Sequence, residues 1–176
     1  DVSFEVVFRD KIGLIGPNGS GKSTLAKMMI GLEEADSGSV SLHKGVKVKF
    51  LSQKMNYPDS LTVEDLLGLS SGENYRAEKI VQQMNFSSFL KKKISSLSGG
   101  ERKKAELLSV FSEDHDFIVL DEPTNHLDLE MIFFLENQLK SSKFTWICIS
   151  HDRHFLEKTA TKIIHMDKIY PNKLKV

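Results

Sequence analysis

The chain has 176 residues, with 24 lysines and arginines against 24 aspartates and glutamates, so its formal net charge is zero. This balance excludes a general electrostatic attraction to nucleic acids or membrane surfaces, and the length fits one domain with its own core. The single cysteine, Cys148, cannot form an internal disulfide, and its apolar neighbours indicate a buried thiol in a reducing compartment rather than a catalytic one.

No apolar stretch approaches the roughly 18 residues that a membrane-spanning helix requires, and the first residues show no signal-peptide pattern. We therefore expect a soluble, cytoplasmic protein without direct membrane insertion, although docking on a membrane protein stays open. The abrupt start within a strand-like stretch is typical of a fragment or of a chain that lacks an upstream segment.

Residues 2–8 and 11–15 predict two strands joined by a short polar turn. The second strand leads into residues 16–24, Gly-Pro-Asn-Gly-Ser-Gly-Lys-Ser-Thr, in which four residues separate two glycines and Lys-Ser follows at once. Residues 25–30 then predict a helix that ends at Gly31.

This strand, loop and helix form a phosphate cradle. Glycines let successive backbone N–H groups point at anionic oxygens, and the helix adds its N-terminal dipole. Lys22 can reach the terminal phosphates, and the Ser23 hydroxyl can ligate magnesium. The alternative is a glycine-rich turn before a helix, but the Lys-Ser pair at this offset favours nucleoside triphosphate binding.

Alternating apolar residues at 40–50 predict a hairpin, after which Gln53 lies at a strand-to-loop junction. From residue 55 onward, Thr62 and Asp65 can cap a short helix, and further short helices follow, so we expect a helical subdomain at about 55–112. Residues 91–93, three lysines, are most simply a solvated helix end; a phosphate-binding patch is the alternative.

Ser98 and Glu101 predict a capping box at the start of the next helix. A buried strand at 117–120 leads to Asp121 and Glu122, and a second buried strand at 144–149 leads to His151. Further helices are predicted at 131–139 and 153–159, and a final strand at 163–166. The pattern predicts an α/β fold with a mainly parallel sheet, an N-terminal β portion and an inserted helical subdomain.

In such sheets the active site lies beyond the carboxyl ends of the strands. Asp121 is the candidate for the magnesium-associated acid, and Glu122 for the general base that orients water. Gln53 can offer its amide to magnesium or water, and His151 can donate to the γ-phosphate. Taken singly, each has an ordinary alternative: two solvated loop acids, a loop glutamine and a histidine after a strand.

Together these motifs resemble the nucleotide-binding domain of ABC ATPases, over almost the whole chain. The resembling segments are Gly16–Thr24, Gln53, Leu97–Glu101 with its Leu-Ser-Gly-Gly signature, Leu120–Thr124, Leu127-Asp128 and His151. The resemblance implies a phosphate-loop NTPase that hydrolyses ATP with Mg²⁺, with Gln53 as Q-loop residue, Asp128 as D-loop acid and His151 as switch histidine. The implied catalytic residues are Glu122, His151 and Gln53; the metal ligands are Ser23, Gln53 and Asp121; the nucleotide-binding residues are Gly16, Pro17, Asn18, Gly19, Ser20, Gly21, Lys22, Ser23, Thr24, Ser98, Gly99, Gly100 and Glu101.

The signature also has a physical meaning of its own. Two glycines behind an N-cap serine leave a helix N-terminus bare as an anion site, and the alternative is an ordinary capped helix. By resemblance this segment serves a nucleotide held by a second ABC domain, from the same chain or a second copy, so that two domains enclose two ATP molecules head to tail.

Residues 121–128 and 150–156 are similar to the soluble ABC-F branch, which implies a ribosome-associated ATPase. The stretch from Gln53 to Ser98 is filled by predicted short helices, so no long arm is expected. The chain looks like an armless second domain, a truncated piece of a longer protein or a single-domain relative. One alternative is the ATP-binding subunit of a membrane transporter. A second alternative is a non-hydrolysing assembly module, which the presence of Glu122, Gln53 and His151 disfavours. The adenine-stacking residue of the family lies upstream of the given sequence, so base selectivity follows from the resemblance alone.

Overall fold

The structure is a computed structural model that describes residues 3–53, 55–72, 74–166 and 174–175. The strands are β1 (Lys11–Ile15), β2 (Val48–Leu51), β3 (Phe117–Asp121), β4 (Thr145–Ile149), β5 (Lys162–Met166) and β6 (Leu174–Lys175). The helices are α1 (Lys22–Met29), α2 (Val63–Leu66), α3 (Tyr75–Gln83), α4 (Gly99–Ser112), α5 (Leu129–Ser141) and α6 (Arg153–Thr159), with 3₁₀ turns η1 (Ser87–Phe89) and η2 (Ile94–Ser96). None of these helices is long and apolar enough to cross a membrane.

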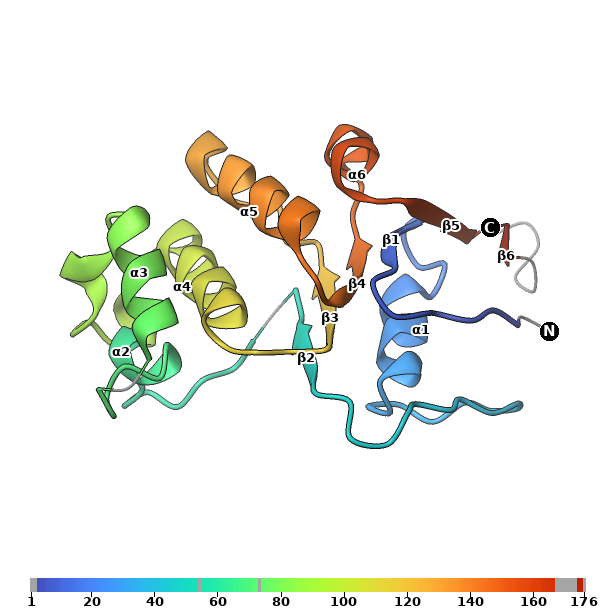
Figure 1. The fold of residues 1–176 in the computed structure, drawn as a ribbon, viewed down its shortest axis with the longest axis horizontal. Helices are drawn as coiled ribbons and strands as arrows, with labels where there is room; N and C mark the ends of the chain where they lie inside the picture. Colours follow the sequence, from blue (N-terminus) through green and yellow to red (C-terminus); the bar gives the residue numbers. More distant parts are fainter. Residues whose placement is uncertain (1–2, 54, 73, 167–173, 176) are drawn as a thin grey trace.

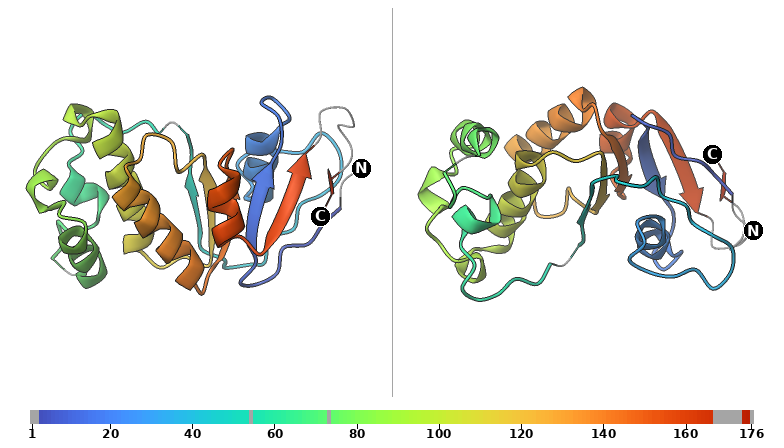
Figure 2. Two further views of the ribbon diagram at one scale, coloured as in Figure 1. Left: turned by 90° about the horizontal axis from the view of Figure 1, so that it is seen from above. Right: turned by 60° about the horizontal axis from the view of Figure 1, so that its bottom comes forward.

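The strands form one sheet in the order β2-β3-β4-β1-β5-β6. Neighbours among the first five strands pair in parallel, and β6 pairs antiparallel with β5. Helix α1 covers one face of this sheet, and α5 and α6 cover the other (Figures 1 and 2). The predicted α/β fold with a mainly parallel sheet is confirmed.

The central strands are apolar on both faces because both faces are covered. In β3, Phe117 and Val119 join the cluster that includes Ala26 of α1, while Ile118 and Leu120 join the cluster on the other face. Strand β4 alternates in the same way. Its Cys148 is fully buried, and burial raises the pKa of the thiol well above its ordinary value, so the predicted core position is confirmed.

The helices between β2 and β3 gather at one end of the sheet (Figure 1). Thr62 and Asp65 form a capping box on α2, as predicted, and Asn74 caps α3 by accepting from the amide of Ala77 at 3.0 Å. Helix α4 packs against α2, α3 and β2, so it joins the helical region to the sheet. The predicted helices in this stretch are confirmed, and residues 91–93 are exposed, as a solvated helix end requires.

Two predicted strands are wrong. Residues 3–8 form no strand, while residue 2 lies outside the described residues, and residues 39–47 form no hairpin. Val40 and Leu42 are 53% and 43% exposed, so the apolar side chains of the first expected hairpin strand are not buried. Alternation alone does not make a strand, because a strand also needs a partner for its backbone groups. Residues 48–51 find that partner in β3, with which they pair in parallel.

Candidate nucleotide-binding site

The carboxyl ends of the parallel strands meet at one edge of the sheet, and several predicted site residues follow these ends. Strand β1 runs into the loop that begins at Gly16, and β3 ends at Asp121. The amide of Glu122 donates a 2.9 Å hydrogen bond to the carbonyl of Ile149, which ties the ends of β3 and β4 together. Strand β4 separates β3 from β1, so the loop and the two acids lie two strands apart on one edge.

The loop of residues 16–24 requires glycine at its two ends. A Cβ on Gly16, whose φ is +157°, would lie 2.4 Å from the carbonyl oxygen of Met166 at the end of β5. Gly21 occupies the N-cap of α1 with φ +90°, a left-handed conformation that glycine adopts without strain. The cap contributes no side-chain acceptor and the first turn contains no acid, which favours an external anion at this helix start.

Lys22 is only 7% exposed and folds back over the loop. Its Nζ donates to the carbonyl oxygens of Gly16 and Pro17 at 2.8 and 2.9 Å. Burial lowers the pKa of Lys22, and the negative charges of Glu122 and Asp121 partly oppose that shift. The lysine therefore links the loop electrostatically to the two acids.

The two acids are largely removed from water, with Asp121 7% and Glu122 9% exposed. Glu122 has φ +48°, a conformation that costs a non-glycine residue energy and is often found at functional sites. Burial raises the pKa of Glu122, while His151 and Lys22 act in the opposite direction. Oε1 of Glu122 lies 3.5 Å from Nε2 of His151, at ion-pair distance, yet this buried oxygen has no hydrogen-bond partner in the described chain.

These residues fit a magnesium–nucleotide group. Ser20 Oγ and Glu122 Oε1 are buried polar atoms whose hydrogen-bonding capacity the described residues do not use, and such atoms normally find a partner. The Ser23 hydroxyl and the Asp121 carboxylate offer the hard oxygen ligands that Mg²⁺ prefers. The open helix start and the glycine loop suit the phosphates.

The structure gathers some predicted residues more closely than others. Lys22, Asp121, Glu122 and His151 interact with one another through hydrogen-bonding or charged groups, although the His151 side chain is 54% exposed. Gln53 is exposed and lies two residues beyond β2, the outer strand of the sheet. Among the other loop residues, Pro17, Asn18, Gly19 and Thr24 are exposed, and Ser20 and Ser23 are partly buried.

The signature segment lies away from the loop of its own chain. Helix α4, which begins at Gly99, and helix α1 are separated by strands β2–β4 (Figures 1 and 2). The Ser98 hydroxyl donates to Glu101 at 2.7 Å and accepts from its amide at 3.4 Å, which confirms the predicted capping box. These hydrogen bonds from Ser98 lower the pKa of Glu101.

The two glycines of the signature differ in their surroundings. A Cβ on Gly99 would meet no atom of the described residues within 4 Å apart from its chain neighbours and its own helical turn, so packing among these residues does not require glycine there. A Cβ on Gly100 would lie 3.2 Å from the carbonyl oxygen of His126. The exposed position of Gly99 therefore suits close approach by a group from outside the chain.

Some residues have structural roles that the sequence did not indicate. Asp128, predicted as a D-loop acid by resemblance, caps α5 by accepting from the amide of Met131 at 2.8 Å. Lys103 and Glu106 of α4 are 7% and 4% exposed. Their burial was not predicted. The sequence did contain a usable signal, because these two charged residues occupy positions in a helix whose other inward-facing residues are apolar.

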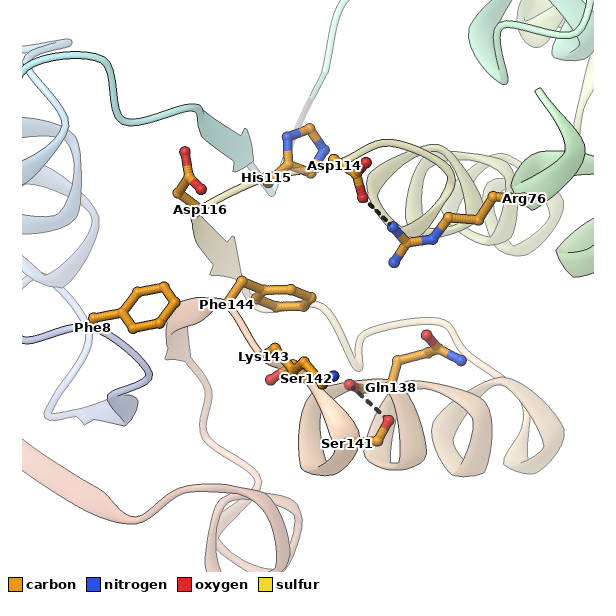
Figure 3. Close-up of a pocket in the computed structure, with 10 residues that line it drawn as sticks. All are labelled: Phe8, Arg76, Asp114, His115, Asp116, Gln138, Ser141, Ser142, Lys143 and Phe144. Carbon is orange, nitrogen blue, oxygen red and sulfur yellow. Dashed lines mark hydrogen bonds and ion pairs between the residues drawn. The ribbon is translucent and has the colours of Figure 1, made fainter. Parts of the chain in front are cut away.

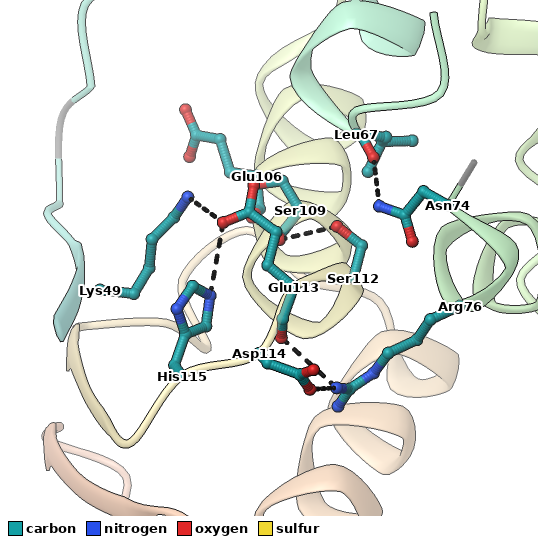
Figure 4. A network of polar contacts seen from close by, with 10 residues as sticks. All are labelled: Lys49, Leu67, Asn74, Arg76, Glu106, Ser109, Ser112, Glu113, Asp114 and His115. Atoms are coloured by element: carbon teal, nitrogen blue, oxygen red, sulfur yellow. Dashed lines mark hydrogen bonds and ion pairs between the residues drawn. The ribbon is translucent and has the colours of Figure 1, made fainter. Parts of the chain in front are cut away.

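A cavity of about 380 Å³ lies at the opposite, amino-terminal edge of the sheet (Figure 3). It is lined by Phe8, Arg76, Asp114, His115, Asp116, Gln138, Ser141, Ser142, Lys143 and Phe144. Next to it, Glu113 lies 3.4 Å from Lys49 and 3.7 Å from Nε2 of His115 (Figure 4). Burial lowers the pKa of the His115 imidazole. This group of polar residues lies at the end of α4 and is separate from the phosphate loop.

A phosphate loop follows the first strand of the parallel sheet, and two acids follow a strand that lies two positions away across that sheet. This combination defines a phosphate-loop NTPase. The family model described as ABC transporter matches residues 1–125. The chain therefore belongs to the ABC transporter family.

The similar proteins include several ABC-F proteins, which confirms the predicted resemblance to that branch. ATP-binding protein Uup of Caulobacter vibrioides is 34% identical over 174 residues, which cover 94% of this chain and 29% of that protein. Energy-dependent translational throttle protein EttA of Escherichia coli is 37% identical, with 93% and 31% covered, and ribosome protection protein VmlR of Bacillus subtilis is 36% identical, with 90% and 29% covered. The chain thus spans about 30% of the length of these curated relatives.

Solved structures share the fold. The ATP binding subunit of an ABC transporter superposes with a TM-score of 0.83 at 22% identity, with 94% of this chain and 78% of that chain covered. The archaeal ribosome recycling factor aABCE1, in complex with the ribosomal stalk protein aP1, gives 0.78 at 23% identity, with 90% and 32% covered.

Proposed function

We propose that this chain binds and hydrolyses ATP with Mg²⁺, as an ABC-type ATP-binding domain that spans residues 1–176 and contains a helical subdomain at about 55–112. The observation that carries the proposal is the shared edge. A glycine loop with Lys22 faces two buried acids there, and one oxygen of Glu122 has no hydrogen-bond partner among the residues that the structure describes. Burial of the site strengthens each electrostatic contact made inside it.

In this proposal the residues have distinct tasks. The loop amides and Lys22 hold the phosphates, while Ser23, Asp121 and Gln53 hold Mg²⁺, which when bound neutralises charge that develops on the transferred phosphoryl group. Glu122 orients the attacking water and accepts its proton. His151, beside Glu122, donates to the γ-phosphate, and the exposure of Gln53 and His151 suits groups that contact a ligand.

We propose that the active site is completed by a second ABC domain, from the same polypeptide or a second copy, that presents its own Ser98–Glu101 segment. Two features support this arrangement. The helix start at Gly99 is exposed and sterically open, and it lies on the far side of strands β2–β4 from the phosphate loop of its own chain (Figure 1). An anion site at that helix start therefore serves a nucleotide held elsewhere.

The relatives favour a cytoplasmic, ribosome-associated role of the ABC-F type. One of them is named a translational throttle protein and another a ribosome protection protein. The alternative role is that of the ATP-binding subunit of a membrane transporter, for which the similar solved subunit supplies the fold only.

Phosphate release from Mg-ATP by the purified protein tests the proposed activity. We expect turnover that Lys22→Ala reduces by about 10²–10³-fold, the usual cost of losing one charge-stabilising donor. Turnover equal in the two proteins would contradict the proposal.

Addition of ribosomes or of membrane vesicles distinguishes the ABC-F role from the transporter role. We expect ribosomes to stimulate hydrolysis and membrane vesicles to leave it unchanged. Co-purification with a membrane subunit, together with stimulation by vesicles that contain it, would instead establish the transporter role.

A further inference from the structure

A row of charged side chains runs through the first half of α4, where burial makes charge costly. Glu106 is 4% and Lys103 7% exposed, and Arg102 lies at the border of the same face. Nε of Arg102 lies 3.2 Å from Oε1 of Glu106, one helical turn along. Such an arrangement is stable only when each charge has partners. Glu106 finds its charged partners on α4 itself, whereas Arg102 also has partners outside the helix.

Arg102 reaches the segment that follows Gln53. One guanidinium nitrogen donates to the backbone carbonyl of Met55. The guanidinium carbon also lies 5.2 Å from the centre of the Tyr57 ring, within the range of a cation–π contact. Arg102 thus contacts both the backbone and a side chain of the segment that begins two residues after Gln53.

Two other residues strengthen this connection. Glu106 fixes the guanidinium by its ion pair, and burial of Glu106 would be unfavourable without it. Burial also raises the pKa of the Tyr57 hydroxyl, so the ring stays neutral against the helix. Arg102 directly follows the signature segment, so a single side chain connects the helix that presents Ser98 to residues 55–57, which begin two positions after the proposed metal or water ligand Gln53.

We infer that Arg102 is a positioning residue that locks the segment after Gln53 to α4, so that Gln53 and the signature segment shift as one body. A planar guanidinium suits this task, because it can pair with a carboxylate, donate to a carbonyl and stack on a ring at once. A lysine cannot make all three contacts. The inference rests on the proposed ATPase function for its effect on turnover, but its structural part does not.

Hydrogen exchange and kinetics of the full protein test the inference with three variants: Arg102→Met, Arg102→Lys and the control Arg76→Met. Arg76 is also on a helix of this region and forms a 2.7 Å ion pair with Asp114, but it makes no contact with residues 55–57. In Arg102→Met we expect amides of residues 55–61 to exchange about tenfold faster, with unchanged affinity for Mg-ATP and a lower thermal midpoint, because the buried Glu106 loses its ion-pair partner. We expect kcat to fall about tenfold and KM to stay within about twofold, with Arg102→Lys intermediate and Arg76→Met like the wild type.

Each outcome discriminates. Wild-type exchange at residues 55–61 in Arg102→Met would overturn the inference, and so would faster exchange with kcat unchanged. A wild-type protein without ATPase activity would contradict the proposed function, while the exchange comparison would still support or reject the locking contact. Loss of stability alone is controlled by Asn74→Ala, which removes the cap of α3 in the same helical region. If this variant also lowers kcat per folded molecule, the fall of kcat in Arg102→Met would count against a positioning role. A second cycle with Tyr57→Leu checks the partner: we expect the double variant to lose no more kcat than Arg102→Met alone.

Discussion

The polar and charged groups at the phosphate-loop edge of the sheet differ in their hydrogen bonding from those in the helical region between β2 and β3. At the edge, Lys22, Asp121 and Glu122 are buried together, and a carboxylate oxygen of Glu122 has no hydrogen-bond partner in the described chain. In the helical region several polar groups satisfy one another, as in the capping boxes at Thr62 and Ser98. The first arrangement leaves unused hydrogen-bonding capacity for a ligand. In the second, the polar groups use their hydrogen bonds to hold the helices in place.

The comparison separates two kinds of burial. Buried groups that lack internal partners cost stability and are retained where chemistry needs them. A buried group that is paired, such as Glu106 with the half-buried Arg102, connects one segment to another. Substitutions in the two regions should therefore affect different measurements.

The largest effect is expected for Glu122→Gln. Loss of the carboxylate should reduce kcat by about 10²–10⁴-fold, the usual contribution of a general base, while ATP affinity is retained. Because hydrolysis no longer separates the domains, sedimentation with saturating Mg-ATP should show an ATP-dependent dimer. A persistent monomer under these conditions would contradict the composite site.

Gly99→Ala tests the open helix start directly. Outside its own helical turn, no atom of the described residues lies within 4 Å of the added Cβ. Alanine is favoured over glycine within a helix by about 1 kcal/mol, so the thermal midpoint should stay equal or rise. In the Glu122→Gln background, ATP-dependent dimerisation should weaken about 10- to 100-fold, since the methyl group crowds the approaching nucleotide. Unchanged dimerisation would show that the signature glycine has no partner.

The pH dependence of stability tests the paired burial of Glu106. Burial raises its pKa, and Lys103 and Arg102 offset this only in part. The contribution of this group to stability is therefore complete below the ordinary glutamate pKa and is lost as pH rises through the raised value. We expect thermal melts from pH 4 to 7 to show the wild type gaining stability relative to Glu106→Gln as pH falls; a constant difference would mean that the pKa is not raised.

The smallest effect is expected for Asn74→Ala. The side chain caps α3 and also donates to the carbonyl of Leu67 at 3.1 Å, so its loss should cost about 1 kcal/mol and lower the thermal midpoint by about 2–4 °C. ATP turnover per folded molecule should not change. A fall in kcat at constant thermal midpoint would mean that the helical region does more than support α4.

The sequence determined the features that depend on local chemistry. The glycine loop, the capping boxes at Thr62 and Ser98, the buried strands and the acids at the end of β3 were all predictable, because each depends on residues close together along the chain. The common edge of Gly16, Asp121 and His151 also followed, since parallel strands place their carboxyl ends on one side.

Only the tertiary structure decided which segments find partners. The apolar alternation at 40–50 resembled a hairpin, yet residues 48–51 pair in parallel with β3, because strand pairing depends on what lies alongside. The same holds for α4, where Lys103 and Glu106 are buried although the local sequence does not show which segments cover them. Position along the chain fixed the chemistry of each group, and packing fixed whether that group has an internal partner or is left for a ligand.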